Sequence, residues 1–298
     1  MKIAFLIVAV ALLTFLIILV LTIFEKKIYN MIIDIMEKNP DSIILPYDTK
    51  DKFGTLQIYP TKPNGREWFV NMENPLEDNI FQPGMKLTKQ NDDAWRVNGT
   101  IKSGPQIPKI RMDVTTPNTF EYWKNVEISG YVRVVSYNNT DDTLVWYARG
   151  IQHTDKFPCQ GTSLKSRLSV DGIVSWKKEI WHTGGYTDGK GKSTIGQSIF
   201  NKWVGWKVVI YNIKNETAVK MESYVDINNN NDWIKVSDVL DDGGWYAKTS
   251  NELFYSVNCG KPKDYVVINS GPIVAFRSDN LIWDFKNLSV REILPPVN

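Results

Sequence analysis

Two histidines occur in this chain, and each lies close to residues that could assist acid–base chemistry. His153 follows Arg149 in the segment that begins at Tyr147, and His182 precedes Tyr186. A histidine beside a tyrosine and an arginine could neutralise a uronate carboxylate, abstract the neighbouring proton and protonate the leaving oxygen. His182 or His153 is then the candidate base of a polysaccharide lyase, Tyr186 the acid and Arg149 the carboxylate clamp. The alternative is that both histidines are hydrogen-bonded structural residues.

A second group of candidate residues follows from a hairpin signal. Asp171-Gly172 separates two alternating runs and is typical of a two-residue turn, which would pair Val170 with Ile173. That pairing places the following side chains on one sheet face: Lys165, Arg167, Trp176, Lys178 and, further along, His182. Such a cationic, aromatic face suits an acidic sugar polymer, with Tyr147 and Trp181 as further aromatic ligand-binding candidates. The alternative is a solvated face with snorkelling lysines.

One loop has oxygen-bearing side chains at alternate positions, as a calcium loop does. Its candidate ligands are Asp226, Asn228, Asn230 and Asp232. The sixth position is Asn231 instead of glycine, and the twelfth is Ser237 instead of a bidentate glutamate. An Asn-rich hairpin tip explains the same residues without metal and is favoured over calcium. His153, Asp155, Glu179 and His182 show no short metal-ligand spacing.

Strands must position these residues, because the chain after residue 50 alternates apolar and polar side chains. The runs expected to be strands are 126–134, 144–148, 164–170, 173–181, 203–211, 221–225, 233–236, 273–276 and 282–293. No long helical period appears after residue 40, and Gly, Pro and Asn punctuate the runs. The fold class expected is all-β: one two-sheet antiparallel jelly-roll sandwich spanning 55–298.

The sequence pattern of the N-terminal segment predicts a membrane anchor. Residues 3–24 contain no charged side chain and are long enough to cross a bilayer core of roughly 30 Å as a helix. The helical pattern continues to Asn39-Pro40, so residues 1–40 are expected to form a transmembrane and stalk helix, with 41–54 as a linker. A cleaved signal peptide is the alternative, but no small-residue cleavage site precedes the charges at Glu25 and Lys26.

The cysteines and the N-glycosylation sequons indicate on which side of the membrane the β domain lies. Cys159 and Cys259 are the two cysteines, and as a disulfide they would close a loop of about 100 residues. Two free thiols are the alternative. Sequons that could carry N-glycans begin at Asn98, Asn138, Asn215 and Asn287. With the anchor, these features place the β domain outside the cytoplasm, on a single-pass protein of the cell membrane.

Charge excludes one class of partner. The chain has 35 basic and 33 acidic residues, a net charge of +2, with no basic half or tail. A nucleic-acid binder that depends on bulk electrostatics is therefore excluded. The aromatic content, with 11 Trp, 13 Tyr and 12 Phe, is the unusual feature of the composition.

Several motifs together resemble a known family. They are Ile58–Trp68, Tyr147-Ala-Arg-Gly, Cys159-Gln-Gly-Thr, Lys177-Lys-Glu-Ile-Trp-His182, Lys202–Lys207 and Phe285–Ile293. Over about residues 55–293 the chain resembles the concanavalin A-like lectin/glucanase jelly roll. The similarity is to the extracytoplasmic, sugar-associated type common in archaeal proteins, some of them related to polysaccharide lyases. Alginate-lyase-like members carry Arg-x-Glu-Leu-Arg, Gln-Ile-His and Tyr-Phe-Lys-Ala-Gly strands that this chain lacks.

Three functions are consistent with these patterns. The first is a membrane-anchored carbohydrate-binding domain for polysaccharides, including acidic glycans. The second is a lyase acting on an anionic polysaccharide, and the third is a structural or assembly protein of the cell envelope. Glycoside hydrolysis is disfavoured because it needs two positioned carboxylates, and no Glu-x-Asp-x-Glu strand occurs.

Overall fold

The computed structural model describes a β domain in detail. The residues it describes are 27, 49–104, 106–116, 122–152, 154, 156–157, 159–247, 259 and 261–296. One compact unit is Asp48–Pro295, and the other is Met1–Tyr47 with Pro296–Asn298. The anchor helix expected over residues 1–40 lies outside the described residues except for Lys27, which is helical and exposed. Among the described residues, no helix is both long and apolar enough to cross a membrane.

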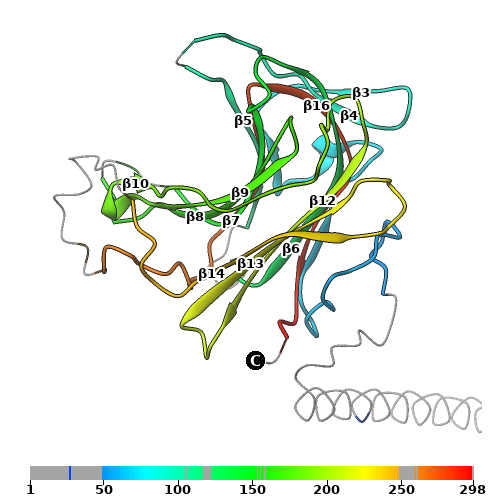
Figure 1. Cartoon of the computed structure of the whole chain (residues 1–298). Helices are drawn as coiled ribbons and strands as arrows, with labels where there is room; N and C mark the ends of the chain where they lie inside the picture. The colour runs from blue at the N-terminus through cyan, green and yellow to red at the C-terminus, as the bar shows by residue number, and fades with distance from the viewer. Residues whose placement is uncertain are drawn as a thin grey trace, which may run out of the picture. The chain divides into compact units, whose positions relative to one another are not determined.

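Two antiparallel sheets form the β domain, and Figure 1 shows them as separate layers. Sheet I has the order β14 (Ile234–Asp241), β13 (Ala218–Asp226), β12 (Val204–Ile213), β6 (Val126–Tyr137), β16 (Leu281–Glu292), β4 (Trp95–Val97) and β3 (Leu87–Lys89), with β1 (Glu67–Phe69) also on β16. Sheet II has the order β10 (Gly185–Tyr186), β9 (Ile173–Ile180), β8 (Thr162–Ser169), β7 (Thr143–Ile151), β15 (Ile273–Asp279), β5 (Lys109–Thr115) and β2 (Phe81–Pro83), with β11 (Lys190–Thr194) also on β9. Short 3-10 turns occur at Pro75–Glu77 (η1) and Trp181–Thr183 (η3). The all-β, two-sheet antiparallel sandwich expected from the sequence is confirmed, and it is consistent with a jelly roll.

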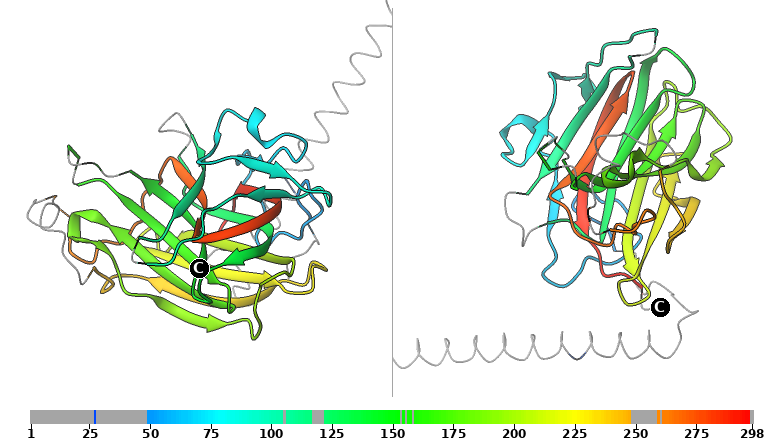
Figure 2. Two further views of the ribbon diagram at one scale, coloured as in Figure 1. Left: turned by 90° about the horizontal axis from the view of Figure 1, so that it is seen from above. Right: turned by 90° about the vertical axis from the view of Figure 1, so that its left-hand side faces the viewer.

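Strands far apart in the chain pair in the middle of each sheet. In sheet I the C-terminal strand β16 pairs with β6, and Figure 2 shows the two side by side. In sheet II β15 lies between β5 and β7 and pairs with both. Every run expected to be a strand is present. Seven further strands in the described part of the chain were not expected. Of these, β1–β4 and β10 have three residues or fewer, too short to show a period of two, whereas β5 and β11 have seven and five residues.

Aromatic side chains fill the space between the sheets. Trp146 of β7 and Trp206 of β12 have ring centroids 4.5 Å apart, and Phe276 of β15 meets Trp146 edge to face at 5.0 Å. All three side chains are fully buried. Aromatic pairs at these separations add about 0.5–1.5 kcal/mol beyond the burial of their area. Much of the high aromatic content therefore serves the core.

The register of the β8–β9 hairpin differs from the prediction by one residue. Lys165 pairs with Lys177 and Ser166 with Trp176, so three residues, Val170 to Gly172, connect the strands. Gly172 has a φ of +82°, and its N–H donates to the carbonyl of Ser169. A three-residue hairpin with glycine in this conformation is a common alternative to the two-residue turn. The predicted pairing of Lys165 with Lys178 is wrong, because the extra loop residue moves every β9 side chain to the opposite face.

A buried ion cluster joins sheet I to the segment that covers its outer face. Glu127 accepts hydrogen bonds from the Nζ of Lys207 at 2.6 Å and from the backbone N–H of Ile58 at 2.9 Å. The carboxylate oxygen that accepts from Ile58 also lies 2.9 Å from an Nη of Arg291. All three charged side chains are at most 1% exposed. Residues near the N-terminal end of the domain are therefore tied to the centre of sheet I.

The predicted disulfide is confirmed. Cys159 and Cys259 are bonded, with a sequence separation of 100 residues. The bond connects the segment between β7 and β8 with the segment between β14 and β15. A cross-link of this span restricts the unfolded chain far more than the folded one.

Reducing this disulfide should lower the stability of the β domain. The chain-entropy relation gives up to about 4.7 kcal/mol for a loop of this length. Urea unfolding of the full-length protein, followed by fluorescence with and without reductant, measures the loss. Cys159→Ser with Cys259→Ser should match the reduced wild type and be insensitive to reductant. Unchanged midpoints after complete reduction would contradict the expectation.

Candidate functional site

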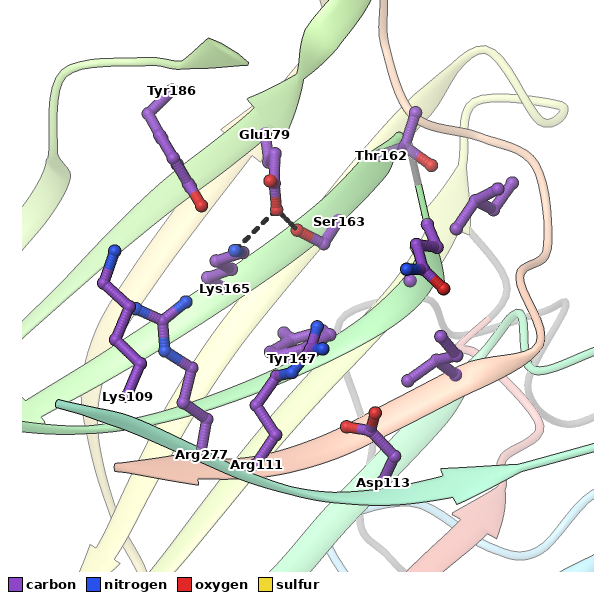
Figure 3. Close-up of a pocket in the computed structure, with 14 residues that line it drawn as sticks. Lys109, Arg111, Asp113, Tyr147, Thr162, Ser163, Lys165, Glu179, Tyr186 and Arg277 are labelled. Carbon is purple, nitrogen blue, oxygen red and sulfur yellow. Dashed lines mark hydrogen bonds and ion pairs between the residues drawn. The ribbon is translucent and has the colours of Figure 1, made fainter. Parts of the chain in front are cut away.

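The outer face of sheet II carries two adjoining hollows, with volumes of about 420 and 220 Å³. They share Lys109, Lys165, Tyr186 and Arg277, and together we call them the groove. Its cationic side chains are Lys109, Arg111, Lys165, Arg167, Lys177 and Arg277, and its acidic ones are Asp113, Glu179 and Asp279. Figure 3 shows Arg111, Arg277, Lys109 and Lys165 around the same space.

Strand alternation explains why these residues share one face. Met112 of β5, Trp146 of β7 and Phe276 of β15 point into the core. Their neighbours along each strand, including Arg111, Tyr147 and Arg277, therefore point away from sheet I. On β9 the core residue Trp176 likewise leaves the side chains of odd-numbered residues facing outward.

Like charges stand directly opposite each other in the groove. Arg111 of β5 pairs with Arg277 of β15, and Lys165 of β8 pairs with Lys177 of β9. Such pairs repel, which destabilises the sheet unless an anion or water screens them. Burial and then the charge of Arg167 lower the pKa of Lys177. Six cations against three carboxylates give the groove a net charge of +3 when all are ionised.

Only part of this positive charge is neutralised within the protein. Lys165 is paired with Glu179, and Arg277 with Asp279. Within the described part of the chain, Arg111, Arg167 and Lys177 form no ion pair with a carboxylate. A groove of this kind attracts anions and repels cations.

Glu179 is held as a carboxylate at one end of the groove. It accepts a hydrogen bond from the hydroxyl of Ser163 at 2.7 Å and is also bonded by Lys165 and by the indole N–H of Trp181. Burial alone would raise the pKa of Glu179, but Lys165, with these hydrogen bonds, lowers it to about 2. Glu179 therefore stays ionised at neutral pH and offsets the charge of Lys165.

Two tyrosines give the groove its aromatic surface. The ammonium of Lys165 lies 5.1 Å from the ring centroid of Tyr147 and 4.7 Å from that of Tyr186. Tyr147 is 4% exposed and forms part of the floor, whereas Tyr186 is 36% exposed. Burial and then Glu179 raise the pKa of Tyr186 to about 12. Both phenols are neutral at pH 7 and can donate hydrogen bonds to a ligand.

Glu179→Gln should increase the affinity of the groove for anions. The substitution removes the carboxylate that pairs with Lys165 and keeps the size of the side chain. Removing one negative charge beside a bound anion is worth about 1 kcal/mol where water screens the ligand, roughly a fivefold gain. Binding of polygalacturonate by the full-length protein measures the change, with Glu73→Gln on the exposed surface as the charge-matched control. Equal affinity in the two variants would contradict the role assigned to Glu179.

Some residues predicted from the sequence meet in the groove and others do not. Lys165, Arg167, Tyr147 and Tyr186 line it, and Trp181 contacts it through Glu179. Trp176 is fully buried in the core. Lys178 is also fully buried, with its Nζ 2.8 Å from Asp241. Both point away from Lys165, because the register differs from the predicted one.

Among the described residues, the predicted lyase residues Arg149, His182 and Tyr186 do not line one site. Arg149 is 0% exposed and donates to the backbone carbonyls of Lys124 and Val267, so its guanidinium serves the structure. His182 is 5% exposed and packs edge to face on Tyr265 at 5.4 Å. Burial and then Lys261 lower the pKa of His182 to about 4. Neither lines the groove with Tyr186, and His153 lies outside the described residues.

The candidate calcium loop forms the tip of the β13–β14 hairpin. Both carboxylate oxygens of Asp226 accept backbone N–H groups, from Asn230 at 3.1 Å and from Asn231 at 2.7 Å. The amide of Asn230 accepts the N–H of Asp232, and Asn228 is exposed. These bonds are those of an Asn-rich turn. Among the described residues, no three His, Cys, Asp or Glu side chains are grouped as metal ligands.

The four sequons lie in different settings. Asn138 and Asn215 are exposed, whereas Asn98 and Asn287 are half-buried. The side chain of Asn98 donates to the hydroxyl of Thr88 at 3.0 Å. Asn287 lies in a β-bulge of β16 with a φ of +53°. N-glycosylation of these residues stays a prediction.

The sequence-based prediction missed six of the nine charged residues of the groove. Lys109, Arg111 and Asp113 come from β5, a strand that was not predicted although Ile110, Met112 and Val114 alternate with them. Arg277 and Asp279 lie in β15 beyond its predicted end. The predicted register of the β8–β9 hairpin placed Lys177 on the core face of sheet II instead of its outer face. The alternation in β5 was a usable signal, whereas the three-residue loop was not readable from Asp171-Gly172 alone.

Comparisons with known proteins give structural similarities only. No protein-family model and no curated protein sequence matches the chain. Among solved structures, the carbohydrate-binding module CBM66 from Bacillus subtilis is 10% identical, covers 66% of this chain and 93% of its own, and has a TM-score of 0.38.

Two further solved structures are similar over more of the chain. The Ca²⁺-bound exoplasmic/lumenal domain of VIP36 is 10% identical and covers 84% of this chain and 89% of its own, with a TM-score of 0.42. A protein of unknown function with a galectin-like fold from Bacillus subtilis is 7% identical, covers 80% and 99%, and has a TM-score of 0.46. These similarities, with TM-scores below 0.5 and identities of 10% or less, assign neither a ligand nor an activity to the chain.

Proposed function

We propose that the β domain binds an acidic polysaccharide in the groove on sheet II. The observation that carries this proposal is the pair of like-charged cross-strand contacts, Arg111 with Arg277 and Lys165 with Lys177, on one open face. A ligand that brings carboxylate or sulfate groups between these cations relieves the repulsion. Guanidinium groups bind such oxyanions in a bidentate manner.

The shape and the aromatic residues favour a carbohydrate over a simple anion. The larger hollow, of about 420 Å³, falls within the roughly 300–1,000 Å³ of small-molecule sites. Tyr186 presents an exposed ring and hydroxyl at its side, and Tyr147 lies in its floor. A sugar ring offers C–H faces to such aromatics and hydroxyls to Ser163 and Gln152.

The carboxylates of the groove favour binding over hydrolysis. Glu179 is on β9 and Asp113 on β5, with β8, β7 and β15 between them. Four strand spacings of about 4.8 Å separate their backbones by roughly 19 Å along the sheet. Glycosidases place their two carboxylates roughly 5–10 Å apart. The lyase predicted from the sequence lacks its clamp in the groove, because Arg149 is buried elsewhere.

The membrane anchor and the extracytoplasmic location complete the proposal. The uncharged run at residues 3–24 supports an anchor. The Cys159–Cys259 disulfide supports an oxidising compartment, because such bonds persist mainly outside the cytosol. A tethered domain of this kind would hold a polymer close to the cell surface.

Salt-dependent binding tests the proposed function. Full-length protein in mild detergent is titrated with polygalacturonate, dextran sulfate and neutral dextran. If the groove neutralises three charges of a single-stranded polyanion, the affinity for that polyanion should fall about 20-fold between 50 and 200 mM salt. The two acidic polymers separate carboxylate from sulfate recognition, and neutral dextran should not bind the groove. Equal binding of all three polymers, independent of salt, would overturn the proposal.

A further inference from the structure

A third hollow lies on the other side of the sandwich from the groove. It has a volume of about 270 Å³ and lies at Tyr131 of β6, which points outward from sheet I between the core residues Ile128 and Val132. Its walls are formed by Phe53, Gly54, Thr55, Trp203, Asn229, Asn231, Lys286 and Asn287. We call it the sheet I hollow. Its size, below the roughly 300–1,000 Å³ of larger ligand sites, suits one small ring.

Close packing fixes the floor of the sheet I hollow. Gly205 of β12 lies beside Tyr131, and a Cβ at this position would meet the ring of Trp233 at 2.6 Å and that of Tyr131 at 2.9 Å. A residue larger than glycine would therefore push the Tyr131 ring away. The hydroxyl of Tyr131 donates to Asp226 at 3.3 Å, which holds the ring in place.

Hydrogen bonds fix the wall formed by the N-terminal segment of the domain. The side chain of Asn231 accepts the N–H of Leu56 and donates to the carbonyl of Gly54, both at 3.0 Å. Asp51 in turn accepts the N–H groups of Phe53 and Thr55 at 2.9 Å. The hollow is thus built by contacts between segments some 175 residues apart.

Its lining combines aromatic rings with two amides that have no side-chain hydrogen-bond partner in the part of the chain that the structure describes. Asn229 and Asn287 make no side-chain hydrogen bond within the described residues, and each has a positive φ. Trp203 lines the same space, with the ammonium of Lys286 4.8 Å from its ring centroid. An amide offers a donor and an acceptor side by side, which matches the neighbouring hydroxyls of a sugar ring.

We propose that the sheet I hollow is a second saccharide-binding site, which takes a single sugar residue independently of the groove. Two sites on opposite faces would let one domain contact two glycan chains. The sugar could be free or could be attached to Asn287, which begins a sequon and lines the hollow. The hollow would recognise a free and an attached sugar by the same contacts. Protein made in hosts with and without N-glycosylation distinguishes the two sources.

Saturation-transfer NMR tests the second site. The probes are methyl glycosides of neutral hexoses and of hexuronic acids, added to full-length protein made without N-glycosylation. Trp203→Ala and the gentler Asn229→Asp should weaken the affinity for the neutral glycosides, measured by titrating the transfer, by about tenfold, equivalent to roughly 1.4 kcal/mol. Phe200→Ala, an exposed aromatic that does not line the hollow, should leave the transfer unchanged.

Two further variants distinguish binding in the sheet I hollow from binding in the groove and from occupancy by a sugar attached to Asn287. Arg167→Glu with Lys177→Glu damages only the groove and should spare the transfer to the hollow. In protein from an N-glycosylating host, a sugar on Asn287 should abolish the transfer, and Ser289→Ala, which removes the sequon, should restore it. Absence of transfer to every neutral glycoside in unglycosylated protein, or transfer to a neutral glycoside that survives Trp203→Ala, would overturn the second site.

Discussion

Replacing both Arg167 and Lys177 with glutamate should reduce the affinity for acidic polysaccharide by at least about 100-fold. Each partly exposed cation near a polyanion contributes about 1 kcal/mol of attraction, and each reversal adds a repulsion of similar size. Two reversals thus change the binding free energy by about 4 kcal/mol in the ideal case, and screening reduces this figure. Both side chains are half-buried on the outer face of sheet II, where neither forms an ion pair with a carboxylate among the described residues.

The matched control changes the charge of the protein equally but leaves the groove intact. Lys62 and Lys202 are exposed and do not line the groove, so Lys62→Glu with Lys202→Glu should cost little affinity. Titrations with polygalacturonate at low salt compare the two double variants, and circular dichroism verifies that both fold. Similar losses in both would mean that net charge, and not the groove, attracts the polymer.

The sequence predicted the strands well because their alternation is a local property. β6, β7 and β12 each bury one face against the core, so their apolar residues recur with a period of two. Pairing between distant strands has no such local signature. That β15 lies between β5 and β7, and so brings Arg277 beside Arg111, could not be read from any single segment.

The prediction of which residues face the candidate site depended on the register of the β8–β9 hairpin, and one loop residue determines that register. Asp171-Gly172 correctly indicated a hairpin, but Gly172 occupies the last position of a three-residue connection. Sequence motifs for two- and three-residue hairpins overlap, since both use glycine at positive φ. The cationic face survived the error because Lys177 and Lys178 are adjacent, so either register places a lysine opposite Lys165.

Buried polar residues were the other source of error. Arg149 has the residue type of a carboxylate clamp, yet it bonds backbone carbonyls inside the domain. Burial lowers its pKa to about 9. Neither the burial of Arg149 nor that of His182 shows in the local sequence, because both depend on segments more than 75 residues away, at Val267 and Tyr265.

Glu127→Gln should destabilise the β domain by about 3–5 kcal/mol, the cost of leaving buried charges without their partner. Glu127 is the common partner of Lys207 and Arg291 on the outer face of sheet I, and it also accepts the N–H of Ile58. The substitution keeps the shape of the side chain but leaves two buried cations uncompensated. A loss of this size is a large part of the roughly 5–15 kcal/mol that typically holds a domain folded.

The same carboxylate predicts how stability depends on pH. Burial alone would raise the pKa of Glu127, but Arg291 and Lys207 lower it to about 2. A carboxyl group whose pKa is lower in the folded state stabilises that state above its unfolded pKa of roughly 4.3. The contribution is lost as the pH falls from there towards 2. The wild type should therefore lose stability over this interval, and Glu127→Gln should lose less.

Urea unfolding of the full-length protein at pH 7 and pH 3 measures both effects. Glu292→Gln is the matched control, because Glu292 is in the same sheet but pairs with Arg66 at a partly exposed site. Loss of such a pair costs about 0–1 kcal/mol. Adding Lys207→Met to Glu127→Gln should recover part of the stability, since it removes one of the uncompensated charges. Equal losses of unfolding free energy in Glu127→Gln and Glu292→Gln would mean that the cluster behaves as a solvated ion pair. The segment at Ile58 would then be held on sheet I by apolar packing alone.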